Sequence, residues 1–134
     1  FYLVAELAPL MAARGAGAIV NVTTMVASIG MAGMAAYGSS KAAVELLTRA
    51  WAAEFGPAGV RVNAVSPGPT RTEFGEVAGF GGGKILDKLG MNAAAVVDQG
   101  LRALELNQAV KVTGTLNKVG AAATRRSDGR GDRP

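Results

Sequence analysis

The chain has 134 residues, of which 49% are hydrophobic and 18% charged, which is typical of one globular domain and too short for two. It contains neither Cys nor His, which excludes disulfides, a thiolate nucleophile, a His-based triad and the usual zinc sites. The formal net charge of +4 falls to +2 when residues 125–134 are set aside, and no basic stripe remains that would indicate nucleic-acid binding.

Two apolar stretches match a membrane segment in length alone. Residues 1–15 lack a basic leading region and carry Glu6, which argues against a signal peptide. Residues 15–40 contain no charge, but their many glycines, serines and threonines are too polar and turn-forming for a spanning helix. We therefore expect a soluble, cytoplasmic protein that binds neither membrane nor nucleic acid.

The first half of the chain reads as helix, strand, helix. Residues 1–14 carry a helical stripe despite Pro9, and no capping residue precedes it, as if the sequence began inside a helix. Residues 18–23 are a short β-branched run between glycines, which predicts a buried parallel strand. Residues 37–55 repeat apolar side chains at helical spacing and end at a Gly-Pro-Ala-Gly turn. The two apolar sets are Leu3, Leu7, Leu10 and Met11, then Val44, Leu47, Trp51 and Phe55.

The second half continues with a strand, a glycine-rich stretch, a helix, a third strand and a disordered basic tail. A Pro-Gly-Pro turn stops the first of these strands, and Asn92 is a suitable N-cap for the helix. These segments are residues 60–65, 75–90, 93–106, 110–113 and 121–134.

The alternation of helices and strands predicts an α/β fold. Right-handed crossovers between the strands would give a parallel sheet of three strands with flanking helices, within one domain over residues 1–120. Open parallel sheets bind ligands at the carboxyl ends of their strands. The two candidate sites, after Val22 and after Val65, both lie at such ends.

Tyr37 and Lys41 are four residues apart in the first turns of the second helix, so both side chains lie on one face. A lysine ammonium beside a phenol stabilises the phenolate, which makes the phenol a usable general acid or base. The alternative is a solvated helix face on which Lys41 pairs with Glu45, and Glu45 pairs onward with Arg49. The spacing alone favours this alternative.

The sequence around Tyr37 and Lys41 favours the catalytic interpretation over the solvated helix face. Thr24 stands at the end of the first strand, thirteen residues before Tyr37, and PGPTRT follows the second strand at residues 67–72. The runs IVNVTT, AAYGSSKAA and VRVNAVSPGPTRTEF resemble, in order and separation, those of the short-chain dehydrogenase/reductase superfamily over residues 18–74. This resemblance implies the C-terminal half of a doubly wound, Rossmann-type fold. It also implies an oxidoreductase that moves hydride between NAD or NADP and an alcohol or carbonyl substrate.

The resemblance assigns roles residue by residue. Tyr37 would exchange a proton with the substrate oxygen, and Lys41 would bind the nicotinamide ribose and support the Tyr37 phenolate. Thr24, where the family usually has Ser, would steady the substrate oxygen, and as a β-branched residue it has a restricted rotamer. Asn63 would have a structural role through its amide. The cofactor contacts would be Tyr37, Lys41, Pro67, Gly68, Thr70 and Thr72, with Thr70 acting mainly through its backbone.

The remaining expectations concern the whole protein. Residues 73–91 would form a mobile substrate lid, and the family assembles into oligomers through helices that match residues 1–14 and 37–55. The family's TGxxxGxG turn and NNAG strand have no counterpart in the chain and would lie before Phe1, so we expect a fragment that is inactive alone. The alternative is a non-catalytic remnant or interaction module. Three nearby hydroxyls are expected to cap or pack, those of Ser28, Ser39 and Ser40.

Overall fold

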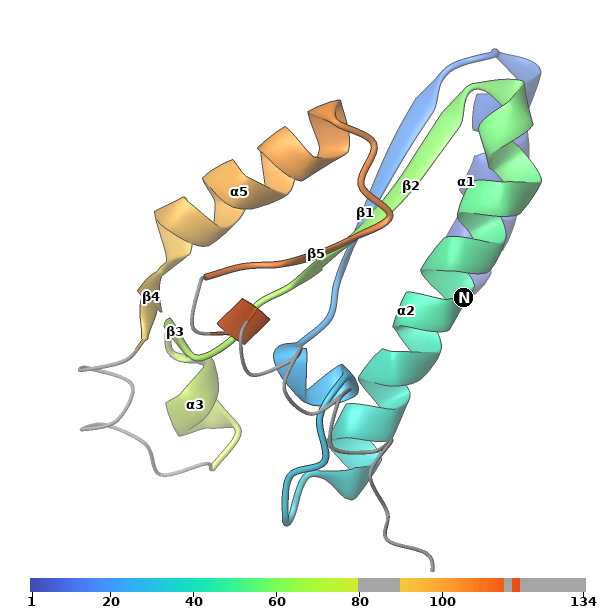
Figure 1. Cartoon of the computed structure of the whole chain (residues 1–134). Helices are drawn as coiled ribbons and strands as arrows, with labels where there is room; N and C mark the ends of the chain where they lie inside the picture. Colours follow the sequence, from blue (N-terminus) through green and yellow to red (C-terminus); the bar gives the residue numbers. More distant parts are fainter. Residues whose placement is uncertain (80–89, 115–116, 119–134) are drawn as a thin grey trace, which may run out of the picture.

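A three-stranded parallel sheet forms the centre of the protein. The computed structural model describes residues 1–79, 90–114 and 117–118. Strands β1 (Gly17–Val22), β2 (Val60–Ser66) and β5 (Val110–Val112) pair in the order β1-β2-β5, and both pairs are parallel. Helices α1 (Tyr2–Ala13) and α2 (Ala35–Phe55) lie on one face, and α5 (Ala93–Glu105) lies on the other (Figure 1). The predicted fold class is confirmed.

The core lies between β2 and the two helices α1 and α2. Val60 and Val62 of β2 are 1% exposed and cluster with Trp51 of α2 and with Val4 and Ala8 of α1. On the opposite face of the sheet, β2 meets α5 at a glycine. A Cβ added at Gly100 would lie 2.8 Å from the Val65 side chain, so this helix approaches the strand closely because it carries no side chain there.

Strand β1 is an edge strand, which corrects the prediction that it is buried. Its residues alternate between half-buried and exposed, and Val20 and Val22 are exposed to 42% and 63%. The reason is that α5 packs mainly against β2, β5 and a small second sheet, which leaves the outer face of β1 bare. Sequence composition indicates a strand that suits burial, but it does not say how many neighbours cover it.

Helix α1 continues through Pro9 without interruption, in agreement with the predicted helix. Its buried residues are Val4 and Ala8, with Met11 packed beside them, rather than the leucine stripe. Leu3 and Leu10 are 71% and 68% exposed. The stripe therefore predicted the helix correctly but not the face that packs on the sheet.

A tight turn links α2 to β2. The 3₁₀ helix η2 (Gly56–Ala58) follows α2, and Gly59 then adopts a left-handed conformation with φ +81°. A Cβ at Gly59 would overlap the carbonyl of Gly15, which stands two residues before β1. Glycine is thus required where the two strands enter the sheet side by side.

The structure contains several short elements that the sequence did not predict. A 3₁₀ helix η1 (Met25–Ala27) follows β1, α3 (Phe74–Val77) follows the Pro-Gly loop, and β3 (Thr70–Arg71) pairs in parallel with β4 (Met91–Asn92). The predicted N-cap of α5 is confirmed, because Asn92 Oδ1 accepts a hydrogen bond from the Ala94 amide at 2.8 Å.

Three predictions fall partly or wholly on residues that the structure does not describe. The expected tail over 121–134 and the domain boundary at residue 120 lie outside the described residues, as does most of the expected lid. Within the described ranges, no helix has both the length and the apolar character needed to cross a bilayer.

Candidate active site

The carboxyl ends of β1 and β2 form one edge. Val22 pairs with Val65 in the sheet, and the contact continues past both strands. The Thr23 amide donates to the Val65 carbonyl at 2.8 Å, and the Met25 amide donates to the Pro67 carbonyl at 2.8 Å. The two segments that the sequence singled out therefore leave the sheet side by side, as expected for parallel strands.

Lys41 lies at this edge rather than on a solvated helix face. Its Nζ donates a hydrogen bond to the Val22 carbonyl at 3.1 Å. Glu45, one turn later, is only 4% exposed, and its Oε1 accepts a hydrogen bond from Thr23 Oγ1 at 3.0 Å. The alternative chain of pairs from Lys41 through Glu45 to Arg49 is wrong, because the Glu45 side chain is turned inward against β1.

Three polar contacts fix the rotation of α2 against β1. They join Lys41 to Val22, Glu45 to Thr23 and Thr48 to Asn21, the last at 2.9 Å between Asn21 Nδ2 and Thr48 Oγ1. They recur about once per helical turn, so one row of α2 faces the strand.

Tyr37 continues this row by one further turn. Because α2 runs back along β1 from its carboxyl end, the turn before Lys41 lies beyond the last residue of the strand. Tyr37 is half-buried, and its ring lies 6.1 Å from the ring of Phe74, centroid to centroid. The phenol is thus bounded on one side by the segment that follows the Pro-Gly loop, a contact that the sequence did not predict.

Thr24 is the first residue past the strand end that carries a candidate role. It is 8% exposed and caps η1, since its Oγ1 accepts a hydrogen bond from the Val26 amide at 3.4 Å. A hydroxyl has two acceptor positions and one donor hydrogen, so this bond leaves the Thr24 O–H hydrogen able to donate.

The Pro-Gly loop is shaped by its own hydroxyls. Thr70 Oγ1 donates to the Gly68 carbonyl at 2.9 Å, and Thr72 Oγ1 accepts from the Phe74 amide at 3.3 Å. The Thr70 hydroxyl thus uses its hydrogen within the loop, whereas the Thr72 hydroxyl only accepts a bond and keeps its hydrogen for donation. Asn63 has the predicted structural role, because its Nδ2 donates to the Gln108 carbonyl at 2.7 Å.

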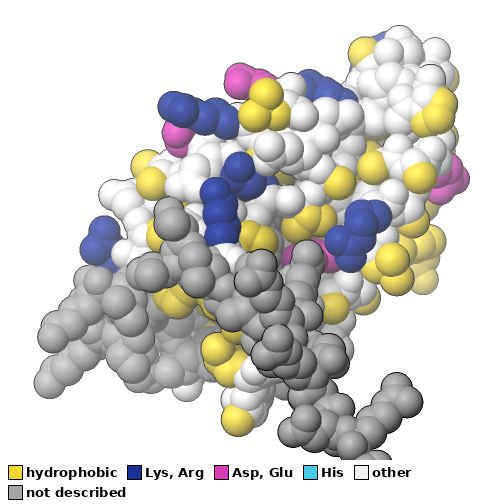
Figure 2. Space-filling view, viewed as in Figure 1, with side chains coloured by type: hydrophobic (Ala, Val, Ile, Leu, Met, Phe, Trp, Pro, Cys, Tyr) yellow, Lys and Arg dark blue, Asp and Glu magenta, His cyan; other side chains and the backbone are white. Residues whose placement is uncertain are grey.

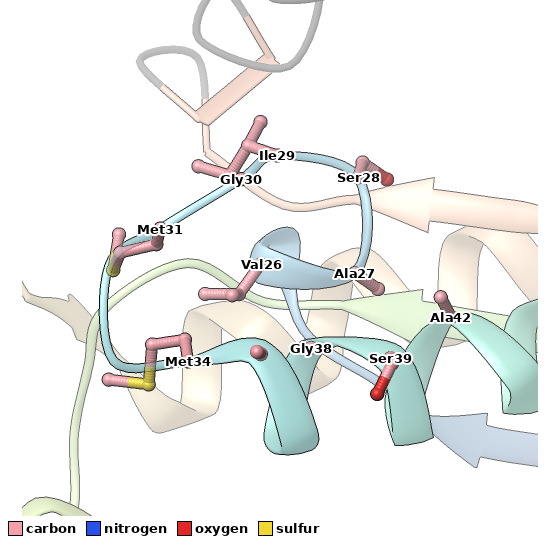
Figure 3. Close-up of a pocket in the computed structure, with 11 residues that line it drawn as sticks. Val26, Ala27, Ser28, Ile29, Gly30, Met31, Met34, Gly38, Ser39 and Ala42 are labelled. Atoms are coloured by element: carbon pink, nitrogen blue, oxygen red, sulfur yellow. The ribbon is translucent and has the colours of Figure 1, made fainter.

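A groove of about 430 Å³ lies beside the loop between β1 and α2 (Figure 3). On α2 it is lined by Ala35, Gly38, Ser39 and Ala42, which occupy a different side of the helix from Tyr37 and Lys41. Ser28 also lines it, whereas the hydroxyls of Ser39 and Ser40 donate back to carbonyls of their own helix. These serines pack or bond locally, as expected.

On the face that Figure 2 shows, the charged side chains of the described residues add no second candidate site. Figure 2, drawn from the same side as Figure 1, shows Lys and Arg side chains in separate groups rather than in a continuous stripe. Hydrophobic side chains are scattered over the side where α1 and α2 lie. On the face shown, the charged side chains do not form the continuous groove of a nucleic-acid-binding protein.

Comparison with known proteins decides the family. The family model described as enoyl-(acyl carrier protein) reductase matches residues 1–111. The chain belongs to the short-chain dehydrogenase/reductase family. A short-chain dehydrogenase from Sphingobium yanoikuyae, solved in complex with NADPH, is similar with a TM-score of 0.77 and 30% identity. That match covers 98% of this chain and 52% of the dehydrogenase.

Curated relatives of this short-chain dehydrogenase/reductase chain match over a shorter stretch. Cis-4-hydroxycyclohexanecarboxylate dehydrogenase of Sinomonas cyclohexanicum is 47% identical over 70 residues, which is 52% of this chain and 27% of that enzyme. Galactitol 2-dehydrogenase of Cereibacter sphaeroides is 54% identical over 66 residues, or 48% of this chain and 26% of that enzyme. The chain therefore spans about half the length of its solved relatives and aligns with about a quarter of the curated ones.

Proposed function

We propose that this chain supplies the nicotinamide side of the active site of an NAD(P)-dependent oxidoreductase that interconverts an alcohol and a carbonyl compound. The proposal is supported mainly by the position of Tyr37 and Lys41 on the face of α2 that packs against β1. Lys41 is held at the carboxyl end of β1 by its bond to Val22, and Tyr37 lies one turn beyond it. Thr24 leaves the same strand with a hydroxyl hydrogen to spare.

The residues present fit the nicotinamide ribose end of such a cofactor. An ammonium carries three donor hydrogens, and the bond to Val22 uses one, so Lys41 keeps donors for ribose hydroxyls. Pro67, Gly68, Thr70 and Thr72 would contact the nicotinamide from the other strand end. The chain has no TGxxxGxG turn, and we assign no residue here to the pyrophosphate. NAD and NADP fit these residues equally, and the bound nicotinamide would donate or accept hydride at its C4 atom.

The chain's own residues would handle the proton. In carbonyl reduction, the Tyr37 hydroxyl gives its proton to the substrate oxygen as hydride reaches the carbonyl carbon, which yields the alcohol and leaves a phenolate. The Lys41 ammonium stabilises that phenolate by its charge. The Thr24 hydroxyl donates a hydrogen bond to the substrate oxygen, where negative charge develops. In alcohol oxidation the same proton moves in reverse.

A second function is favoured by the exposed apolar side chains of α1 and α2. Leu3, Leu10 and Leu46 are 71%, 68% and 64% exposed, which suits association of these helices with a second copy. The edge strand β1 is also bare on its outer face. A non-catalytic interaction module is therefore the alternative to the oxidoreductase, while an oxidoreductase could use the same surface to form a homo-oligomer.

Substitution of Tyr37 by Phe tests the oxidoreductase function. Because this chain spans about half the length of its solved relatives, the variant is made in the full-length protein. There Tyr37→Phe removes only the hydroxyl, so turnover should fall by about 10²–10⁴-fold, the usual contribution of a general acid or base, while cofactor binding changes little. Tyr2→Phe is the matched control, because Tyr2 is 84% exposed and far from the site in sequence. Turnover is followed by NAD(P)H absorbance with a panel of carbonyl compounds, and binding by cofactor fluorescence.

Two results would contradict the proposal. Retained turnover in Tyr37→Phe would remove Tyr37 as the proton donor. A full-length protein with neither cofactor binding nor turnover would leave the interaction module as the function of this chain.

A further inference from the structure

Asn117 fills a slot between two loops. A Cβ added at Gly68, in the loop after β2, would overlap the Asn117 carboxamide. A Cβ added at Gly114, which follows β5 and has φ +82°, would lie 2.9 Å from Asn117 Nδ2. Two glycines from distant parts of the chain thus leave the space that this one side chain occupies.

The carboxamide also links the segments around that slot. Asn117 Nδ2 donates to the Thr113 carbonyl at 2.8 Å, just past β5, and lies 3.7 Å from the Met91 sulfur. Met91 begins β4, pairs with Thr70 of β3 and donates its amide to the Pro69 carbonyl at 2.9 Å. Asn117 therefore contacts the Pro-Gly loop directly at Gly68 and indirectly, through Met91, at its far end.

Besides Asn117, the loop is held at its start by the hydrogen bond from the Met25 amide to the Pro67 carbonyl. Its regular structure is a ladder of two residues per strand, and the Thr70 hydroxyl bonds only within the loop. A ladder this short is weak on its own. Loss of the Asn117 side chain would leave open space beside Gly68, a residue with no side chain to fill it.

We propose that Asn117 is a positioning residue that holds the Gly68 segment where a nicotinamide cofactor would meet it, and so sets cofactor affinity. This inference rests on the proposed oxidoreductase function. Asn117 would touch neither substrate nor cofactor, and its effect passes through the Gly68 backbone. Its removal should therefore weaken cofactor binding more than it slows proton transfer at Tyr37.

Asn117→Ala in the purified full-length protein tests this role, with Lys118→Ala as the matched control because Lys118 is its exposed neighbour. We expect Asn117→Ala to raise the cofactor KM about tenfold and to change kcat less than about threefold. The effect is smaller than the loss of about a hundredfold in rate that a displacement of ~1 Å can cause, because the loop keeps its other contacts. Hydrogen exchange of the amides from Gly68 to Thr72 should accelerate about tenfold without cofactor. Lys118→Ala should change neither quantity.

Gly68→Ala provides a second test of the same contact, which is needed if Asn117→Ala folds poorly. Gly68→Ala should weaken cofactor binding in the wild-type background, because its methyl group meets the Asn117 carboxamide. In the Asn117→Ala background the same methyl group enters freed space, so the added loss should be smaller. Equal losses in the two backgrounds would show that this contact does not position the loop.

The outcomes separate this inference from the function it rests on. Unchanged loop exchange and unchanged cofactor KM in Asn117→Ala would overturn the positioning role, and so would a general loss of stability with an unaltered KM. If the full-length wild-type protein binds no nicotinamide cofactor, the proposed function fails. Loop exchange that still accelerates only between Gly68 and Thr72 would then support the positioning of the loop by itself.

Discussion

Thr24 combines two tasks in one hydroxyl. Its oxygen caps η1 by accepting from the Val26 amide, while its hydrogen is the donor proposed for the substrate oxygen. The family usually has Ser at this position, and Thr adds a methyl group that restricts the rotamer. A variant at Thr24 therefore affects both local stability and turnover, and the two effects need separate measurements.

Thr24→Ala should lower turnover by about 10²–10³-fold, the range found when one donor to a developing oxyanion is removed. It should also cost about 1 kcal/mol of stability through the lost cap. Thr24→Ser keeps both functions and should retain near-normal turnover. Steady-state rates and the denaturant midpoint are measured for both variants. Near-normal rates in Thr24→Ala would show that the hydroxyl takes no part in the reaction.

At the scale of elements, α2 is placed by polar contacts as much as by its apolar face. Glu45 is the most buried charged side chain in this contact, and Thr23 donates to it from β1. A buried hydrogen-bonded pair of this kind favours one rotation of the helix, because any other rotation would leave a carboxylate without its donor. That rotation is what directs Lys41 and Tyr37 to the strand end.

Glu45→Ala should reduce the free energy of unfolding by about 1 kcal/mol, the net contribution of one hydrogen bond, because the Thr23 hydroxyl can still donate to the Val65 carbonyl at 3.2 Å. Glu45→Gln keeps an acceptor oxygen and should cost less. Glu54→Ala on the same helix is the control, because Glu54 is exposed, and it should stay within about 0.5 kcal/mol of wild type. Chemical denaturation followed by circular dichroism measures all three. Similar losses for Glu45→Ala and Glu54→Ala would argue that the buried contact does not hold α2.

The same elements show what the sequence could and could not predict. Helical spacing placed Tyr37 and Lys41 on one face, and strand composition placed β1 and β2. The same spacing also suggested a solvated pair between Lys41 and Glu45, because an i,i+4 pattern contains no information about which side packs against a strand. The β3–β4 pair could not be predicted, because strands of two residues are too short to show an alternating pattern. The position of Asn117 could not be predicted either, because the two glycines beside it are far apart in sequence.

For the whole molecule, the exposed apolar side chains of α1 and α2 carry the last prediction. The leucine stripe of α1 does not pack on the sheet, and Leu46 of α2 is 64% exposed. Burial of apolar surface gains roughly 25 cal/mol per Å², so several such side chains could hold two copies together. We expect the protein to self-associate through these helices, whether or not it turns over substrate.

Leu46→Glu should weaken this association, because it places a charge within the proposed apolar contact. Leu101→Glu on α5 is the matched control, since Leu101 is 54% exposed but lies on the opposite face of the sheet. Light scattering across a concentration series should show an assembled wild-type protein, an assembled Leu101→Glu variant and a dissociated Leu46→Glu variant. A monomeric wild-type protein, or equal dissociation of both variants, would mean that the surface of α1 and α2 is not the interface. Because Leu46 is remote from the Tyr37 row around the helix, a dissociated variant that still binds cofactor would also separate assembly from the site.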